Sequence, residues 1–280
     1  MTSAFIKINQ NGATYYSIPL FEATRLVAHG FSTRLGGVSQ GTYTSLNLGT
    51  HVGDQSEAVV ENRRRLCGAI GMDTGQIIAA KQVHGDHVHV ATVQDCGRGA
   101  LAYRDALEET DALITNQPGV PLSTYYADCV PLYFLDPVKK AIGLAHAGWK
   151  GTVLQIGRKT LAKMNQVYGS QPEDCLAAIA PSIGPCCYEV GDEVAQEFKK
   201  TFSFWSNVLN PKQQGKWQLD LWEANRLQLL EAGVKADNIA VACLCTGCHN
   251  DIFFSYRADG GITGRLGAFL MLKNRGDKHG

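Results

Sequence analysis

The stretch ADCVPLYFLDPVKKAIGLAHAGWKG, residues 127–151, holds two short apolar runs with a turn between them. Residues 132–135 and 141–145 are predicted strands, because short apolar runs bounded by turn residues are typical of buried strands. Asp136 and Pro137 favour a turn between these runs. The stretch therefore predicts a β-hairpin.

Further strands and helices are predicted on both sides of this hairpin. Asp54 with Glu57, and Asp220 with Glu223, form capping boxes ahead of apolar residues at helical spacing, and Gly169 follows a third amphipathic run as a helix stop. The predicted helices lie within 54–71, 152–168 and 220–233, and the predicted strands are 28–33, 88–93, 176–180 and 239–244. Since the two kinds of element do not alternate strictly, we expect an α/β fold with mixed β-sheets flanked by helices rather than a doubly wound sheet.

The composition limits the size of the fold and the class of partner. The 280 residues are 45% apolar and contain no internal repeat or low-complexity linker, so residues 1–280 are predicted to form a single domain. Lys plus Arg (26) equal Asp plus Glu (26), which offers no basic surface for nucleic acid or for an anionic membrane. We therefore expect a small-molecule partner, and a monomer or a small homo-oligomer.

Targeting signals and cysteine content point to the cytoplasm. The N-terminal residues lack a secretory signal pattern, and no window approaches eighteen uninterrupted apolar residues. Nine cysteines in a chain of this size do not suggest a disulfide framework, because cytosolic thiols stay reduced. The thiols are left to bind metal, to react or to fill the core.

Three histidines lie close together in KQVHGDHVHV, residues 81–90. His87 and His89 share one face of the predicted strand, but a lone H-x-H pair is a weak metal signal, and both read as ordinary surface or half-buried residues. His84 precedes the strand in a glycine-containing loop. It is therefore the histidine best placed to reach a cleft.

The opening stretch carries further candidates at the ends of its strands. Asp128 and Cys129 precede the first strand, where the thiol is equally a core filler or a reactive or metal-bound group. His146 ends the second strand, and Lys150 lies just before a helix, where it is either a phosphate contact or a solvated lysine. His84, Cys129 and His146 are 45 and 17 residues apart. Spacing alone does not join them.

The remaining cysteines form two groups in the sequence. Cys243, Cys245 and Cys248 precede a histidine, but closed zinc sites usually draw four ligands from two separated pairs, so structural or free thiols are favoured. Cys186 and Cys187 are adjacent. In extended backbone their side chains point apart, so one ion is not expected to bind both.

Eight blocks of the sequence, in order, resemble the signature motifs of one family. They are FSTRLGGVSQGTYTSLNLGTHVGD, ENRRRL, KQVHGDHV, TDALIT, ADCVPLYFLDP, AHAGWKGT, APSIGPCCYEVG, and CTGC followed by FFSYRADGGITGR. The family is that of the laccase-domain proteins, long called polyphenol oxidases and now described as purine nucleoside phosphorylases. The blocks run from about residue 30 to about residue 267, nearly the whole chain.

The resemblance implies a single α/β domain distantly similar to the catalytic domain of cytotoxic necrotizing factor. It also implies a zinc site formed by His84 of KQVHGDHV, Cys129 of ADCVP and His146 of AHAGWKG. Three protein ligands leave a fourth position open, which suits catalysis, and copper competes with zinc at such sites. Lys150 occupies a position where Arg is also found in the family.

The resemblance further implies activity on purine nucleosides. Family members are described as phosphorylases of adenosine, inosine and methylthioadenosine, giving a free base and (methylthio)ribose 1-phosphate, and as adenosine deaminases. Arg34 and Lys150 are the nominated phosphate contacts, and Ser45 and Asn47 offer hydrogen bonds to sugar or base. Asp128 is nominated to move protons during deamination.

Three other classes of function stay open at this point. Cys129 could be the nucleophile of a cysteine hydrolase or amidase with His146 or His84 as its base, which fits a reported link of the family to editing of peptidoglycan precursors. A copper-dependent polyphenol oxidase is disfavoured, because a blue-copper centre plus a three-copper cluster needs many imidazoles and the chain has eight histidines. A non-enzymatic binding module is disfavoured by the grouping of Gly, His, Cys and Asp at strand ends.

Overall fold

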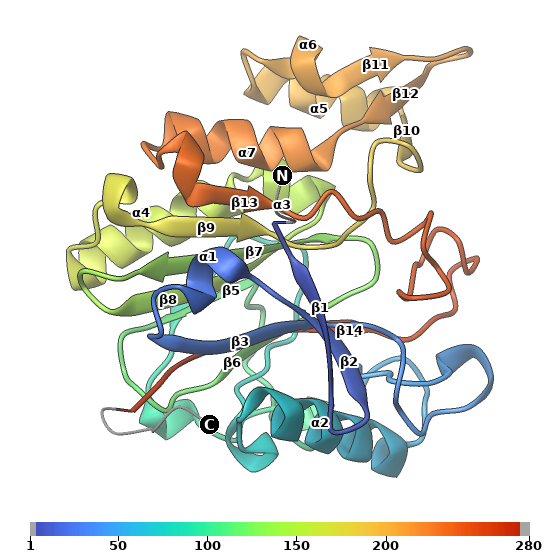
Figure 1. Cartoon of the computed structure of the whole chain (residues 1–280). Helices are drawn as coiled ribbons and strands as arrows, with labels where there is room; N and C mark the ends of the chain where they lie inside the picture. The colour runs from blue at the N-terminus through green and yellow to red at the C-terminus, as the bar shows by residue number, and fades with distance from the viewer. Residues whose placement is uncertain (1–3, 275–280) are drawn as a thin grey trace.

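The computed structural model describes residues 4–274, which form three β-sheets with helices around them (Figure 1). A mixed six-stranded sheet consists, in spatial order, of β13 (Ile239–Val241), β9 (Leu176–Ile179), β7 (Val130–Asp136), β8 (Ala141–Ala147), β5 (Ala112–Thr115) and β4 (Val88–Val90). An antiparallel five-stranded sheet consists of β1 (Ile6–Gln10), β2 (Ala13–Ser17), β3 (Val27–Ser32), β14 (Leu266–Leu272) and β6 (Leu122–Tyr126). A small antiparallel sheet consists of β10 (Glu189–Gly191), β12 (Lys216–Leu219) and β11 (Leu209–Pro211). The predicted α/β fold with mixed sheets flanked by helices is confirmed.

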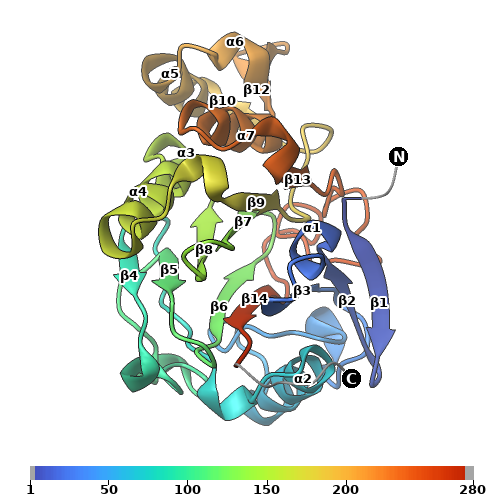
Figure 2. The same ribbon diagram turned by 60° about the vertical axis from the view of Figure 1, so that its left-hand side comes forward.

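Helices cover the sheets from several sides. They are α1 (Pro19–Glu22), α2 (Ser56–Ile70), α3 (Trp149–Val153), α4 (Ile156–Tyr168), α5 (Asp192–Thr201), α6 (Trp205–Val208) and α7 (Leu221–Glu231). α2 packs on β2 and β3, and α4 packs on β8 and β5. Figure 2 shows α5, α6 and the small sheet at one end of the molecule and α2 at the opposite end. Within residues 4–274, no helix combines the length and apolarity that a membrane crossing requires.

The predicted hairpin lies in the middle of the six-stranded sheet. β7 and β8 pair along their whole length, and all their residues are buried. Asp136 Oδ1 accepts the N–H groups of Val138 and Lys139 at 2.8 and 3.0 Å, which closes the turn. The antiparallel pairing places Cys129, just before β7, beside the end of β8, where His146 lies. The hairpin thus brings two candidate site residues together.

The other predicted strands are present with shifted ends. β3 begins one residue earlier than predicted, whereas β4, β9 and β13 end one to three residues earlier. β4 is short because Thr92 starts a 3₁₀ turn at Val93–Asp95, with its hydroxyl on the Asp95 carboxylate. The sequence analysis missed β1, β2, β5, β6, β10, β11, β12 and β14. The last of these is a largely buried strand that lies between β3 and β6 in the five-stranded sheet.

Neither predicted capping box forms in full. α2 begins at Ser56 with no side-chain cap, because Asp54 Oδ2 instead accepts hydrogen bonds from Ser39 Oγ and Asn47 Nδ2 at 2.6 and 2.9 Å. The carboxylate thus ties two loop segments together. At α7 only the N-cap half of the predicted box is present. Asp220 accepts the N–H of Glu223 at 3.0 Å, but the Asp220 N–H donates to the Val208 carbonyl at 2.8 Å rather than to Glu223.

The predicted helix at 152–168 is two helices rather than one. The break comes at Gln155, whose φ of 60° lies in the left-handed region and interrupts the helical hydrogen bonds between α3 and α4. α3 begins at Trp149, earlier than predicted, so Lys150 lies in its first turn. Gly169 ends α4 in the left-handed conformation, as predicted.

The two larger sheets share a hydrophobic core. Phe31 and Leu270 of the five-stranded sheet and Tyr133 and Leu144 of the six-stranded sheet belong to one buried cluster. The Tyr133 hydroxyl also donates to the carbonyl of Gly30 at 2.8 Å, which joins the sheets by a buried hydrogen bond. The packing therefore fixes the position of one sheet against the other.

Candidate metal centre and active site

The structure brings three nitrogen and sulfur donors into one group. The ligand atoms of His84, Cys129 and His146 lie within 4.8 Å of one another. Cys129 Sγ is 3.7 Å from His84 Nε2, and the two imidazole rings meet edge-on with centroids 4.7 Å apart. His146 is buried and His84 is exposed, so the group opens to solvent on one side. Two imidazoles and a thiol form a donor set that suits zinc.

The backbone around the ligands is constrained. His84 and Asp128 have φ values of 61° and 86°, in the left-handed region that non-glycine residues rarely adopt. Gly148 follows β8, and a Cβ there would lie 2.9 Å from Cys129 Sγ and 3.0 Å from His84 Cδ2. Glycine at this position therefore leaves the ligands room.

Asp111 is a site residue that the sequence analysis did not nominate. It is fully buried, and its Oδ1 lies 2.8 Å from His146 Nδ1. The same carboxylate accepts the N–H groups of Val83, His84 and Gly85 at 3.1, 3.0 and 2.8 Å. Asp111 thus fixes the imidazole ring of His146, whose Nε2 is left for the metal. It also holds the loop that carries His84. Its only sequence signal was an aspartate before a buried strand, in TDALIT.

The electrostatics favour a thiolate at Cys129. Burial opposes ionisation of this thiol, but the charge and hydrogen bond of His146 outweigh burial and lower the pKa of Cys129 to about 6. Burial likewise opposes a charge on His146, yet Cys129 and Asp111 raise the pKa of His146 to about 9. A thiolate is the form of cysteine that binds metals and attacks electrophiles.

The three ligands lie in a cavity of about 620 Å³. Its wall carries cations and aromatic rings, namely Trp149, Lys150, Tyr188, Tyr256, Arg257 and Arg265. The Arg257 guanidinium is 5.3 Å from the centre of the Tyr188 ring, and Lys150 Nζ is 5.6 Å from that of Trp149. Cations suit a phosphate and aromatic faces suit a planar base, so the cavity can accept a small ligand that has both parts.

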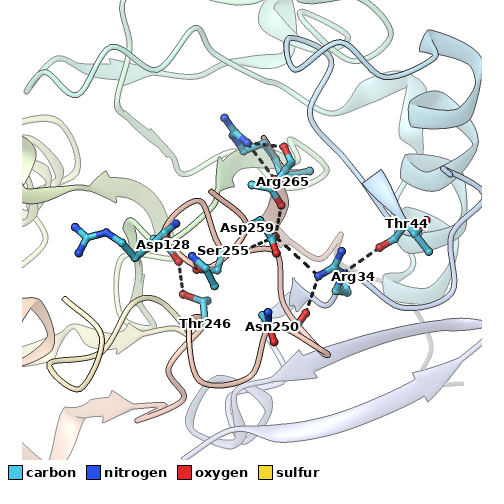
Figure 3. A network of polar contacts seen from close by, with 12 residues as sticks. Arg34, Thr44, Asp128, Thr246, Asn250, Ser255, Asp259 and Arg265 are labelled. Atoms are coloured by element: carbon cyan, nitrogen blue, oxygen red, sulfur yellow. Dashed lines mark hydrogen bonds and ion pairs between the residues drawn. The ribbon is translucent and has the colours of Figure 1, made fainter. Parts of the chain in front are cut away.

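Arg34 anchors a loop. Its Nε donates to the Thr44 carbonyl at 3.0 Å and its Nη1 to the Asn250 carbonyl at 2.6 Å. The guanidinium also lies 3.9 Å from Asp259 Oδ2 (Figure 3). These contacts tie residues 246–265 to the N-terminal part of the chain.

Ser45 and Asn47 also make internal contacts. Ser45 Oγ donates to the Arg34 carbonyl at 2.9 Å, and Asn47 Oδ1 accepts the N–H of Arg265 at 2.8 Å. The lining of the cavity includes Lys150 but not Arg34, Ser45 or Asn47. Of the four nominated substrate contacts, Lys150 is therefore the one brought to the ligand group.

Asp128 lines the cavity beside Cys129, and donors from the loop 246–265 hold its carboxylate. Thr246 Oγ1 donates to Asp128 Oδ1 at 2.6 Å (Figure 3), and the Arg257 N–H donates to Asp128 Oδ2 at 2.7 Å. The sequence analysis missed Arg257 and Arg265, because nothing in their spacing relates them to residues more than a hundred positions earlier. The fold supplies that relation.

His87, His89 and a second group of cysteines lie apart from the three ligands. His87 Nδ1 is 3.2 Å from Thr110 Oγ1, and His89 Nε2 is 3.3 Å from the Asp95 carboxylate. A second donor group in residues 4–274 consists of four thiols, those of Cys186, Cys187, Cys245 and Cys248. The two donor groups together hold two imidazoles, fewer than a blue-copper centre with a three-copper cluster requires.

Comparison with known proteins places this site in a family. The family described as "Multi-copper polyphenol oxidoreductase laccase" matches residues 28–273. The chain belongs to this family. The resemblance of the sequence blocks to the laccase-domain proteins is thereby confirmed.

Relatives in the laccase family carry names of purine enzymes. "Purine nucleoside phosphorylase YlmD" of Bacillus subtilis (strain 168) is 42% identical over 247 residues, which cover 88% of this chain and 89% of the relative. "Adenosine deaminase RL5", from an unknown prokaryotic organism, is 35% identical over 237 residues, which cover 84% and 90%. The crystal structure of YlmD from Geobacillus stearothermophilus matches with a TM-score of 0.92 and 38% identity, over 97% of this chain and 100% of that one.

Proposed function

We propose that this chain cleaves purine nucleosides with inorganic phosphate, giving a free base and ribose 1-phosphate. The proposed substrates are adenosine, inosine and methylthioadenosine, and deamination of adenosine is a further proposed activity. The observation that carries the proposal is a His/Cys/His group in a cavity that also holds cations and aromatic rings. The names of YlmD and RL5 support the same class of substrate.

The donor atoms fit a resident zinc ion. His84 Nε2, Cys129 Sγ and His146 Nε2 would hold it, with the carboxylate of Asp111 behind His146. When bound, zinc supplies Lewis-acid chemistry at the position that the protein leaves open. Copper is the main competitor for the same nitrogen and sulfur atoms.

Phosphate would bind against the cationic wall. Lys150, Arg257 and Arg265 line the cavity, and each can donate charge-assisted hydrogen bonds to phosphate oxygens. Because α3 has only five residues, the ammonium group of Lys150 rather than a helix dipole carries the attraction. Phosphate held here would replace the base at C1′ of the sugar, as the bond to N9 breaks and a C1′–O bond forms.

The base would lie against aromatic rings and near Asp128. Tyr188 and Trp149 offer faces for stacking within the same cavity. The Asp128 carboxylate is fixed by Thr246 and by the backbone of Arg257, so it presents its free lone pairs in one orientation. A carboxylate held in this way can move a proton on the base during phosphorolysis or deamination.

The assay follows ribose 1-phosphate and free base from adenosine and inosine, with and without phosphate, in zinc-replete enzyme. Phosphate-dependent release of both products is expected, and ammonia release from adenosine reports deamination. Cys129→Ser should abolish turnover. A lack of any phosphate-dependent product in fully metallated enzyme would sink the proposal.

The proposal extends to partners and location. Small molecules rather than nucleic acid or a membrane are the expected partners, since the chain carries 26 basic and 26 acidic residues. We place the enzyme in the cytoplasm as a monomer or a small homo-oligomer. Cell fractionation and light scattering of the purified protein test these two points.

One observation favours a second candidate, a cysteine hydrolase or amidase. Cys129, His146 and Asp111 stand in the order nucleophile, base and orienting carboxylate. Hydrolysis of an amide such as that of a peptidoglycan precursor, surviving chelation but lost on alkylation of Cys129, would support it. Turnover that requires zinc and ceases after chelation contradicts it.

A further inference from the structure

Four cysteine thiols from two distant segments form a donor group separate from His84, Cys129 and His146. The Sγ atoms of Cys186, Cys187, Cys245 and Cys248 lie within 4.8 Å of one another. Cys248 Sγ is 3.3 Å from Cys186 Sγ and 3.4 Å from Cys187 Sγ. Cys245 is buried, whereas Cys186 and Cys248 are exposed. The proposed nucleoside chemistry uses none of these thiols.

The expectation that Cys186 and Cys187 point apart is wrong, because a turn curls the backbone at these residues. The N–H groups of Cys187 and Tyr188 both donate to the Gly184 carbonyl, at 3.0 and 3.1 Å. This backbone is therefore curled rather than extended, and both thiols face the same side. The alternation of side chains that holds in a strand does not apply here.

The partner segment is a C-x-x-C turn in CTGC. A Cβ at Gly247 would lie 3.1 Å from Cys187 Cβ and 3.2 Å from its Sγ. Glycine here allows the two segments to approach closely enough for all four sulfur atoms to meet. A C-x-x-C pair is the usual half of a structural zinc site, and the curled Cys186–Cys187 pair supplies the other half.

We propose that Cys186, Cys187, Cys245 and Cys248 bind one structural zinc ion, separate from the His84, Cys129 and His146 group. A tetrahedron with Zn–S bonds of about 2.3 Å has sulfur atoms about 3.8 Å apart. The observed spread, with pairs at 3.3 and 3.4 Å and all within 4.8 Å, brackets that value. Four protein ligands leave no open position, so this zinc is structural rather than catalytic.

A backbone donor beside the cluster suits cysteine thiolates that bind one cation. The Gly184 N–H lies 3.2 Å from Cys245 Sγ, a contact of the kind that stabilises a metal-bound thiolate. A soft divalent ion would displace the protons of the four thiols and balance the negative charge of the resulting thiolates.

The proposed zinc would hold the loops that position Asp128. Thr246, inside the CTGC turn, donates its hydroxyl to Asp128 Oδ1 at 2.6 Å. On the other segment, the Ile183 N–H donates to the Asp128 carbonyl at 2.9 Å. Ser182 and Thr246 are also joined by a backbone hydrogen bond of 3.0 Å. Clamping the two segments therefore fixes Asp128 and its neighbour Cys129.

Metal content of the purified chain tests the proposal without reference to turnover. Two zinc ions per chain are expected in the wild type, one for each donor group. One should remain in the double variant Cys186→Ser with Cys248→Ser, and one in His84→Ala with Cys129→Ser. Cys243→Ser is the matched control, because Cys243 is a nearby exposed cysteine outside the cluster, and it should retain two.

A second measurement covers the case in which the double variant does not fold. The His84→Ala, Cys129→Ser protein is loaded with Co²⁺, which gives intense thiolate-to-metal absorption in a four-sulfur site. We expect that absorption to appear. We also expect the four thiols to resist alkylation until a strong chelator is added. Cobalt-free protein, freely alkylated thiols, or a disulfide within the cluster would overturn the proposal while leaving the phosphorylase proposal untouched.

Discussion

His146 Nδ1 lies 2.8 Å from Asp111 Oδ1, and the same carboxylate accepts the backbone N–H of His84 at 3.0 Å. One buried side chain therefore orients a ligand at the end of β8 and a ligand in a loop. The two contacts span 35 and 27 residues of sequence. Asp111 therefore holds two ligands that are distant in sequence in fixed positions. A carboxylate that accepts a hydrogen bond from a metal-bound histidine commonly has this role.

Asp111→Asn should weaken zinc binding at the His84, Cys129 and His146 group by about 10- to 100-fold. The asparagine side chain keeps one acceptor oxygen. Its NH₂ group, however, would face backbone N–H donors that the Asp111 carboxylate accepts in the wild type. Competition with a chromogenic chelator measures the affinity. The control is Asp136→Asn, another buried aspartate that accepts backbone N–H groups, but in the β7–β8 turn. Equal zinc affinity in folded Asp111→Asn and wild type contradicts this role.

Gly148→Ala should obstruct the same site. The added methyl group would lie 2.9 Å from Cys129 Sγ and 3.0 Å from His84 Cδ2, so the ligands must move apart. We expect at least about tenfold weaker zinc binding, measured by the same competition. Gly68→Ala is the control: no atom lies within 4 Å of its new Cβ, and it is exposed in α2. That change should leave zinc affinity intact and raise the free energy of unfolding by up to about 1 kcal/mol.

Lys150→Ala should raise the KM for phosphate more than the KM for nucleoside. Loss of one charge-assisted hydrogen bond, about 1.5–3 kcal/mol, corresponds to about a 10- to 150-fold increase in the KM for phosphate. Steady-state kinetics with each substrate varied in turn separate the two constants. Lys163→Ala, which replaces a partly buried lysine on α4 outside the cavity lining, should change neither KM. An unchanged KM for phosphate in Lys150→Ala would remove this residue from the proposed anion site.

His29 makes the fold sensitive to acid. Burial, and then the charge of Lys273, lowers the pKa of His29 from 6.5 to about 3, and His29 Nε2 accepts the Ile18 N–H at 2.9 Å. Between these two pH values the unfolded chain binds a proton that the folded chain does not, so stability falls as the pH falls. The slope of this loss approaches about 1.4 kcal/mol per pH unit below pH 6.5, and the expected loss from pH 6.5 to 4.5 is about 2 kcal/mol.

Urea unfolding at pH 6.5 and 4.5 tests this linkage. His29→Gln keeps an acceptor for Ile18 but has no titrating ring, so its stability should fall less over this range than that of the wild type. His87→Gln, which replaces an exposed histidine, should follow the wild type. If the wild type and His29→Gln lose equal free energy of unfolding between pH 6.5 and 4.5, another group causes the acid sensitivity.

The central hairpin was predictable from the sequence because its signals are local. Two apolar runs and the Asp136 turn lie within sixteen residues, and β7 and β8 pair as expected. The break at Gln155 was not predictable, since only a left-handed φ at a residue without special propensity divides α3 from α4. Asp54 failed as a cap because Ser39 and Asn47, distant partners, compete for its carboxylate.

The ligand group was named through the family resemblance and not through spacing. Residues that support the ligands were harder to find, because their roles depend on contacts across the fold. Asp111 reaches His146 only because β5 pairs with β8. Arg257 reaches the Asp128 carboxylate from a loop 129 residues later in the sequence. Such relations have no signature in one sequence.

The position of β14 sets an order of events during synthesis. β3 and β6 do not pair with each other; each pairs with β14, which lies between them. Residues 27–32 and 122–126 therefore leave the ribosome long before the strand that unites them. Until residues 266–272 emerge, β3 and β6 each present an open backbone edge, which invites pairing with a neighbouring nascent chain. We therefore expect translation speed and chaperone supply, as well as final stability, to affect the yield of this protein.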